Sequence, residues 1–373
     1  MSTRRARSRL VTDALIVVVI AATSLLIDAT PAFAHGVGGL QPSNFATHVH
    51  GIDPPIMGLS LRATDLGNRV ELRNASAHDV IVLGYQNEPY LRVGPRGVFE
   101  NERSPAVFLN RTSLIPTAAP PRFDPRAAPE WRHISSDPVA RWHDHRSHWM
   151  GSSTPPVVQL SPHERHVLIA NWVIPLRYEN QDLRATGDVV WVPPASPWPW
   201  LALASVLALT VALLAGTRAW PSVLTVALAA LVASEIVSVL GQWDGSTAGT
   251  GTKLSGTVYS LGGCLVGVVA LRSLLRHHDP YDATPMALVA GVFLLIAGGF
   301  TGITTITRSQ VPTTLPASIA RLGVAIALGL GTGLTVGAAR HLIRPRDTAR
   351  PARRPTRARP RARRAPSRTR SIP

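Results

Sequence analysis

The sequence predicts a multi-domain membrane protein, in which an exported all-β domain precedes five transmembrane helices and a disordered basic tail. Three observations predict this fold class. A basic start and a short apolar run open the chain, a series of short strand-like segments follows, and five long apolar runs occupy the region beyond Trp198.

Residues 1–34 have the pattern of an export signal. Several arginines precede an apolar run from Leu15 to Ile27, and the sequence PAFA follows, ending at Ala34. This ending fits the small-x-small cleavage pattern, and the apolar run is short for a membrane span. We therefore expect cleavage after Ala34, which makes His35 the first residue of the mature chain. The alternative is an uncleaved anchor helix.

Residues 35–197 are expected to form the exported domain. Val70 and Leu72 alternate with charged residues, as in a half-exposed antiparallel strand, whereas Val80–Leu83 is apolar throughout and suits an inner strand. Short strands without a helical period predict a β-sandwich, either immunoglobulin-like or cupredoxin-like. The expected strands are 59–63, 69–74, 79–85, 90–93, 106–109, 166–174 and 188–192.

Between about 112 and 165 the strand pattern breaks down, because prolines are frequent there. Trp131, Trp142 and Trp149 argue against disorder in this segment, since such residues are scarce in unfolded chains. We expect an ordered but irregular excursion, which in a compact domain is usually functional.

The five apolar runs predict five transmembrane helices within residues 198–340. Each run is close to the roughly 20 residues that cross about 30 Å of hydrocarbon. The expected helices are about 198–216, 222–240, 254–271, 285–303 and 318–339. With the β domain outside, five crossings place the C-terminus in the cytoplasm, and the sequence predicts a multi-pass protein of the plasma membrane.

Charged residues support this orientation and explain the net charge of +16. Basic residues such as Arg218, Arg272 and Arg276 occupy the loops expected inside, as the positive-inside rule requires. From Arg340 onward, 13 arginines face a single acidic residue, Asp347. Residues 341–373 are therefore expected to be disordered and to lie along anionic lipid headgroups, in preference to binding nucleic acid.

The stretch RWHDHRSHWM holds the strongest candidate site. In an extended chain His143 and His145 lie on one side, about 7 Å apart, and His148 joins them if the chain turns at Ser147. Neutral imidazole is the commonest metal ligand, and nitrogen-rich sites favour copper or zinc. An N-terminal His35 adds an α-amino group as a further ligand. His143, His145, His148 and His35 are thus the predicted metal ligands.

A structural interpretation of the same stretch remains open. Asp144 could pair with Arg141 or Arg146, the tryptophans could pack in the core, and the histidines could be hydrogen-bonded parts of the scaffold. In the metal interpretation, Asp144 instead accepts a hydrogen bond from the ring nitrogen that does not bind the metal, and so orients that imidazole. No nucleophile elbow occurs around Ser147, and the sequence predicts no enzyme.

Two resemblances accompany these patterns. Ala34-His35 and the overall plan resemble the CopC-like copper proteins, β-sandwiches that begin with histidine and are in some cases fused to a CopD membrane domain. The motifs EPYLRVGP and WHDHRSHWM are similar to those of a family of actinobacterial multi-pass membrane proteins with an exported N-terminal domain. The second resemblance implies a bacterial origin and this topology, and it implies no activity.

The apolar runs contain a single acidic residue, Glu235, and intramembrane carboxylates are functional candidates by default. Glu235 lies about one and a half turns from the outer end of its expected helix, so its side chain could instead reach the interface, and Arg321 could pair with it. Two functions follow for the whole chain. The first is a cell-envelope protein whose β domain binds copper or zinc. The second is an interaction module that binds another envelope protein or a second copy of the chain, with the helices as its anchor in the bilayer.

Overall fold

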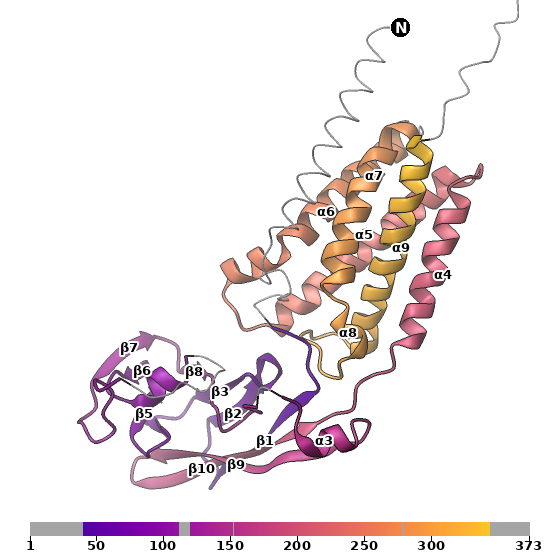
Figure 1. Ribbon diagram of the computed structural model, residues 1–373. Coiled ribbons are helices and arrows are strands. Elements are labelled where there is room, and N and C mark those ends of the chain that lie inside the picture. The colour runs from indigo at the N-terminus through magenta and orange to yellow at the C-terminus, as the bar shows by residue number, and fades with distance from the viewer. Residues whose placement is uncertain (1–39, 112–119, 152, 278–279, 344–373) are drawn as a thin grey trace, which may run out of the picture. The chain divides into compact units, whose positions relative to one another are not determined.

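The computed structural model describes residues 40–111, 120–151, 153–277 and 280–343 (Figure 1). The expected signal at 1–34, His35 and the expected tail beyond Ile343 lie outside these ranges.

Ten strands form two antiparallel sheets in the N-terminal half of the described chain. The larger sheet has the order β1-β10-β9-β4-β5-β6-β7 and the smaller has the order β2-β3-β8. The strands are β1 (Phe45–Asp53), β2 (Leu59–Thr64), β3 (Arg69–Asn74), β4 (Val80–Leu83), β5 (Pro89–Gly94), β6 (Gly97–Asn101), β7 (Trp131–Ser135), β8 (Val139–Trp142), β9 (His166–Tyr178) and β10 (Gln181–Trp191). This is a sandwich-like β domain, as the sequence predicts.

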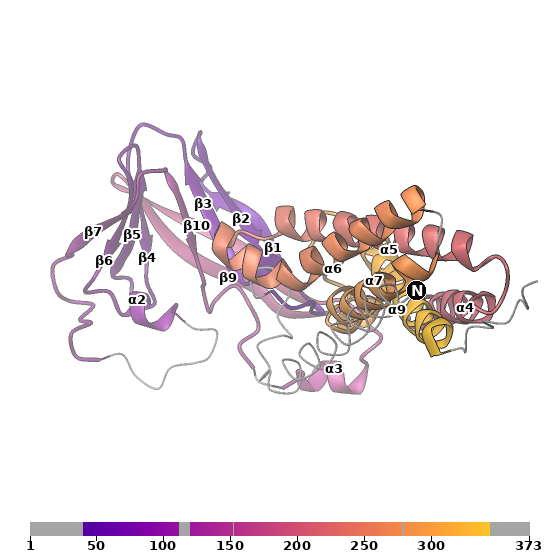
Figure 2. The same cartoon turned by 90° about the horizontal axis from the view of Figure 1, so that it is seen from above.

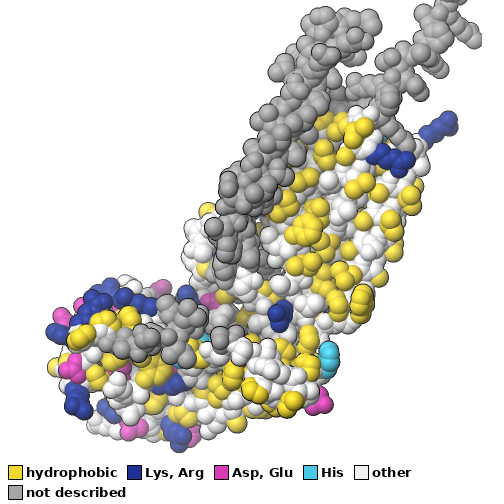
Figure 3. Space-filling model, in the orientation of Figure 1, with side chains coloured by type: hydrophobic (Ala, Val, Ile, Leu, Met, Phe, Trp, Pro, Cys, Tyr) yellow, Lys and Arg dark blue, Asp and Glu magenta, His cyan; other side chains and the backbone are white. Residues whose placement is uncertain are grey.

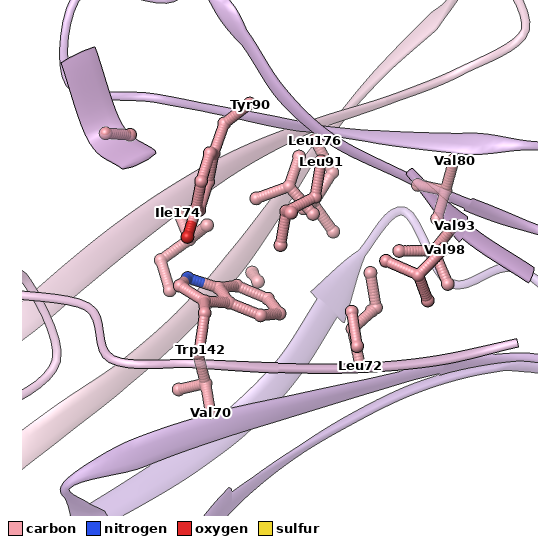
Figure 4. Close-up of a cluster of buried hydrophobic side chains, with 14 of the residues drawn as sticks. Val70, Leu72, Val80, Tyr90, Leu91, Val93, Val98, Trp142, Ile174 and Leu176 are labelled. Atoms are coloured by element: carbon pink, nitrogen blue, oxygen red, sulfur yellow. The ribbon is translucent and has the colours of Figure 1, made fainter. Parts of the chain in front are cut away.

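The core of this domain lies between the two sheets. Val70 and Leu72 of β3 are fully buried, and with Trp142 of β8 they face the side chains of the larger sheet, among them Leu91 and Ile174 (Figure 4). Burial of each such side chain stabilises the fold by about 1.5–3 kcal/mol. The alternation seen at Val70 and Leu72 therefore identifies the true inner face of β3.

The prediction of a strand at 106–109 is wrong, because these residues belong to helix α2 (Pro105–Leu109). Ser104 caps this helix, and its hydroxyl oxygen accepts a hydrogen bond from the backbone N–H of Ala106 at 3.2 Å. Pro105 occupies the first turn, where its fixed φ and missing N–H favour a helix start. The Ser-Pro pair is thus a helix signal that outweighs the apolar run behind it.

Two strands form inside the excursion that was expected to be irregular. β7 pairs with β6 at the edge of the larger sheet, and β8 pairs with β3 in the smaller sheet. The end of β8 matters most for function, because Trp142 is its last residue and the histidines follow directly.

β9 and β10 form a long hairpin whose close contact with β1 depends on Gly187. A Cβ at this position would lie 2.0 Å from the His48 carbonyl oxygen and 2.2 Å from a ring carbon of Trp172. The Trp172 indole lies across the glycine and donates a hydrogen bond to the Asp188 carbonyl at 3.2 Å. Any larger residue at 187 must displace β1 or this indole.

Beyond Trp198 the described chain is helical, and Figure 2 shows the helices gathered into one bundle. The helices are α4 (Trp198–Leu214), α5 (Trp220–Gly245), α6 (Thr250–His277), α7 (Pro280–Leu294), the π-helix η4 (Leu295–Phe300), α8 (Thr304–Thr307) and α9 (Ala317–Ile343). The remaining short helices are η3 (Asp65–Gly67) in the β domain and α3 (Pro156–Leu160).

Four helical segments are long and apolar enough to cross a membrane: α5, α6, the segment Ala283–Thr307 and α9. The sequence predicts a fifth crossing at α4, which has 17 residues. At 1.5 Å per residue this helix extends over about 25 Å, less than the about 30 Å of a hydrocarbon core. Within the described residues there are therefore four segments long enough to cross a membrane and one shorter apolar helix.

The visible surface of the bundle is apolar, as a bilayer environment requires (Figure 3). Leu209, Leu213 and Val226 are more than half exposed, with relative exposures of 62, 69 and 68%. Charged side chains gather instead on the β domain in the same view. This distribution indicates that lipid surrounds the helices.

Small residues allow α4 and α9 to pack closely. A Cβ on Gly329 would lie 2.7 Å from the Ala204 carbonyl oxygen, and one on Gly333 would lie 2.7 Å from Cβ of Val211. Close backbone approach through glycine is a common way to join membrane helices.

Candidate functional site

The histidine loop, residues 143–148, begins where β8 ends. Trp142, the last residue of β8, buries its ring in the core, and its indole N–H donates to Oδ2 of Asp144 at 2.9 Å. Asp144 is completely buried. The loop is thus fixed to the hydrophobic core by its first residues.

A buried ion pair holds the loop. The guanidinium of Arg146 donates through Nε to Oδ1 of Asp144 and through Nη2 to Oδ2, both at 2.8 Å. The backbone N–H of Arg146 also donates to Oδ1 at 3.1 Å. Burial alone would raise the pKa of Asp144, but the hydrogen bonds and charge of Arg146 outweigh it and hold this pKa below its usual value. Asp144 is therefore ionised at neutral pH.

Arg146 also ties the loop to the larger sheet. Its Nη2 donates to the Leu83 carbonyl at the end of β4 at 3.2 Å, and its guanidinium lies 4.8 Å from the ring centre of Tyr85. The Tyr85 hydroxyl accepts a hydrogen bond from the His145 backbone N–H at 3.0 Å. Burial raises the pKa of the Tyr85 phenol, so this hydroxyl stays protonated.

The chain turns sharply within the loop. The backbone N–H and the hydroxyl of Ser147 both donate to the Asp144 carbonyl, at 3.1 and 3.0 Å. The Ser147 carbonyl in turn accepts a hydrogen bond from the Thr47 hydroxyl of β1 at 2.8 Å. This turn at Ser147 brings His148 back toward the other two histidines, which is the condition that the sequence analysis set for a three-histidine site.

The three imidazole rings lie side by side. The ring centres of His143 and His145 are 5.1 Å apart, those of His143 and His148 are 4.1 Å apart, and those of His145 and His148 are 6.0 Å apart. Three imidazoles that share one tetrahedral zinc ion at about 2.0–2.1 Å have ring centres roughly 5 Å apart. The separation between His143 and His145 is near this value, whereas that between His143 and His148 is shorter and that between His145 and His148 is longer.

Two of the three rings are oriented by backbone carbonyls. Nδ1 of His143 lies 2.6 Å from the Asn68 carbonyl oxygen, and Nδ1 of His148 lies 2.9 Å from that of Asp144. A carbonyl oxygen only accepts, so both Nδ1 atoms carry the proton and both Nε2 atoms present a lone pair. Both Nε2 atoms are buried, and neither has a hydrogen-bond partner among the described residues.

Two of the histidines of the loop, His143 and His148, are held in their neutral form. Burial and the neighbouring rings lower the pKa of His148 to about 4, and burial likewise lowers the pKa of His143. Neutral imidazole with Nδ1–H on a carbonyl is the form that binds metals through Nε2. As they stand, however, no three His, Cys, Asp or Glu side chains within the described ranges meet the geometry of a metal site.

The fourth predicted ligand, His35, lies outside the described residues. Two further histidines, His48 and His50 of β1, both face Asp188 of β10, with nitrogen–oxygen distances of 2.6 and 3.3 Å. The sequence analysis foresaw the Asp144–Arg146 pair as one of two options, but it missed Tyr85 and Asn68, which adjoin the loop only through the fold.

Arg141, the other arginine proposed for Asp144, has a different partner. Its Nε donates to Oε2 of Glu71 at 2.5 Å, and Arg62 donates to Oε1 of the same carboxylate at 2.6 Å. In the bundle, the expected pair of Glu235 and Arg321 does not form.

Comparison with known proteins adds no relative: no family model, curated protein or solved structure matches this chain. The functional argument therefore depends on the geometry alone.

Proposed function

We propose that this protein is a membrane-anchored cell-envelope protein whose β domain binds a transition metal ion, copper or zinc, through His143, His145 and His148. The observation that supports the proposal is the pair of buried Nε2 atoms of His143 and His148, which face no partner in the described chain. A buried acceptor without a hydrogen bond costs about 1–3 kcal/mol. A bound metal ion would remove this cost.

The surroundings of the rings support the same proposal. Asp144 and Arg146 fix the loop, while the carbonyls of Asn68 and Asp144 select the tautomer that leaves Nε2 available. Hydrogen-bond acceptors for the ring nitrogen that does not bind the metal, which orient the imidazole, are typical of metal sites built from histidine. Nitrogen ligands favour copper(II) or zinc over the hard cations calcium and magnesium.

The location of the site follows from the expected signal and helices. In the proposed topology, cleavage after Ala34 releases an N-terminus at His35 outside the cell, the chain crosses the membrane five times, and the basic tail contacts anionic headgroups inside. The free amino group of His35 would be an additional ligand for copper. The apolar helices already require a lipid bilayer around them.

The test uses the full chain, produced through its own N-terminal segment and purified in detergent. The protein is loaded separately with Zn²⁺ and Cu²⁺, dialysed, and analysed for metal per chain by mass spectrometry. We expect the wild type to retain one ion and the double variant His143→Ala/His148→Ala to retain none. The matched control is His48→Ala/His50→Ala, which removes two exposed histidines of the same domain and should keep the ion.

Two results would refute the proposal. The first is a wild type that retains neither metal, and the second is a loop variant that retains as much as the control. In either case the histidine loop would be a structural brace around Asp144, and the alternative function, an interaction module that binds an envelope protein or a second copy, would take its place.

A further inference from the structure

A cavity lies between the helices toward one end of the bundle, separate from the histidine loop. Its volume is about 390 Å³, and its walls come from α5, α6, η4, α8, α9, the segment between α8 and α9, and residues 40–42, which precede β1. Pockets for small molecules usually measure about 300–1,000 Å³. The space is thus large enough for a small organic molecule.

One wall of the cavity holds the carboxyl group of Glu235. This residue of α5 is 5% exposed, and its Oε1 accepts a hydrogen bond from the Ser260 hydroxyl of α6 at 2.5 Å. Its Oε2 accepts no hydrogen bond from any residue in the described ranges. Arg321 donates instead to the carbonyls of Thr305 and Arg308, at 3.2 and 2.9 Å. The carboxyl group therefore lies in an apolar bundle with one hydroxyl as its hydrogen-bond donor.

The bundle makes room for this carboxyl group at the π-helix η4. A Cβ on Gly298 would lie 2.2 Å from Oε2 of Glu235. The wide turn is visible in the hydrogen bond from the Thr301 N–H to the Ile296 carbonyl, five residues back, at 3.1 Å. Single π-helical turns often occur at functional sites. Gly298 and the wide turn together leave Oε2 open to the cavity.

The remaining lining determines which ligand fits. Hydroxyl and amide groups of Ser238, Gln242, Thr301 and Thr305 line the same cavity as Glu235, and the described lining contains no lysine, arginine or histidine. A bare metal cation would need about six to eight oxygen ligands at 2.3–2.6 Å, far more than one carboxylate and one hydroxyl in so large a space. The complementary ligand carries one positive charge on a body that fills the cavity.

The cavity extends toward the end of the bundle. Its lining includes Gln242, near the end of α5, and Thr313, in the segment between α8 and α9. Glu235 lies ten residues before Gly245, the last residue of α5, which is about 15 Å along the helix. Glu235 is therefore closer to this end of α5 than to the other, and the cavity extends from it toward this end.

We propose that this cavity binds a small organic ammonium ion, with its NH₃⁺ group on Glu235 and beside Ser260. The rest of the molecule contacts the apolar wall and the hydroxyls around Thr301 and Thr305. The site is independent of the metal site in the β domain.

The experiment uses the full chain in detergent micelles and isothermal titration with two primary amines, butylamine and tyramine. The neutral comparison is 4-ethylphenol, which has the ring of tyramine without its amino group. We expect an amine to bind the wild type, and Glu235→Gln to weaken binding by roughly 10- to 100-fold, because a hydrogen bond between two charged groups is lost. Gly298→Ala should weaken it similarly by displacing Oε2.

The matched control is Asp244→Asn, which removes an exposed carboxylate of the same helix outside the lining and should leave the affinity unchanged. If Glu235→Gln does not fold, labelling of wild-type Glu235 by dicyclohexylcarbodiimide gives the same information, because a bound amine must slow it. The proposal is refuted if neither amine binds the wild type or slows labelling. It is also refuted if Glu235→Gln binds within twofold of the wild type, or if 4-ethylphenol binds as tightly as tyramine.

Discussion

Removing the carboxylate of Asp144 should destabilise the β domain strongly, because four hydrogen bonds end on its two oxygens. Three come from Arg146 and one from the Trp142 indole. Breaking one side of a buried ion pair costs about 3–5 kcal/mol. The Arg146 side chain keeps 19% of its surface exposed and retains the Leu83 carbonyl as a partner. We therefore expect Asp144→Ala to lower the free energy of unfolding of the β domain by about 3 kcal/mol, near the lower limit of this range.

The companion variants isolate the ion pair itself. Arg146→Ala leaves Asp144 charged and completely buried, so it should cost at least as much as Asp144→Ala. The double variant removes both charges, and its cost should fall short of the sum of the single variants by about 2 kcal/mol or more. The control is Arg103→Ala, which breaks an ion pair with Glu130 of similar length, 2.9 Å, on an exposed surface. That change should cost less than about 1 kcal/mol.

Hydrogen exchange followed by mass spectrometry can measure these effects in the full chain in detergent. The amides of β4 and β8 report the free energy of opening of the β domain separately from the helices. This prediction is refuted if Asp144→Ala lowers the free energy of unfolding by no more than Arg103→Ala does. It is also refuted if the cost of the double variant equals the sum of the two single costs. Either result would mean that the loop is held by packing of Trp142 alone.

Three further predictions follow from other parts of the chain. The pKa of His148 lies at about 4, below its ordinary value of 6.5, so the unfolded state binds more protons between these pH values. The β domain should therefore lose up to roughly 3 kcal/mol of stability as the pH falls from 7 to 4, and His148→Gln should abolish most of this loss in urea titrations. Gly187→Ala should expose β1 to limited proteolysis, because its Cβ would lie 2.0 Å from the His48 carbonyl oxygen, whereas Ala185→Gly should not. Reporter fusions at residues 180 and 350 should fall on opposite sides of the membrane if α4 crosses it, and fusions on the same side would leave only the four longer segments as spans.

Long apolar segments were the easiest part of the fold to predict. α5, α6 and α9 each contain the expected run, because twenty or so apolar residues in sequence leave few alternatives to a membrane helix. The ends of the helices were less predictable: α5 extends to Gly245 and α6 begins at Thr250, well beyond the apolar runs. The polar turns at the helix ends contact neighbouring residues, and a hydropathy pattern carries no information about those contacts.

The β domain shows where sequence patterns fail. The inner strand β4 was correctly identified, because Val80–Leu83 lies between β9 and β5 and is apolar on both faces. β7 was missed, since its residues alternate poorly and it lies at a sheet edge where one side needs no partner. Pairing with β6, which the local sequence does not reveal, is what makes this segment a strand.

The histidine loop was recognisable from its residues, but its geometry was not. Whether His148 would face His143 depended on the turn at Ser147, which Ser147 closes on the Asp144 carbonyl and which a hydrogen bond from the Thr47 hydroxyl, 100 positions away in the sequence, ties to β1. The tautomer of His143 likewise depends on the Asn68 carbonyl. Local patterns can therefore nominate ligands, while the fold alone decides which nitrogen atom each ring presents.

The structural brace and the proposed metal site are complementary, because they use different atoms of the same loop. Asp144 and Arg146 satisfy each other and fix the backbone, and that leaves the Nε2 atoms of His143 and His148 without a role in the brace. A loop selected only for stability would gain from an apolar residue at 148, since a buried lone pair without a donor costs about 1–3 kcal/mol. The chain instead holds both rings neutral and buried, oriented by carbonyls and 4.1 Å apart. A local cost of this kind next to a rigid brace supports the proposed binding role of the loop.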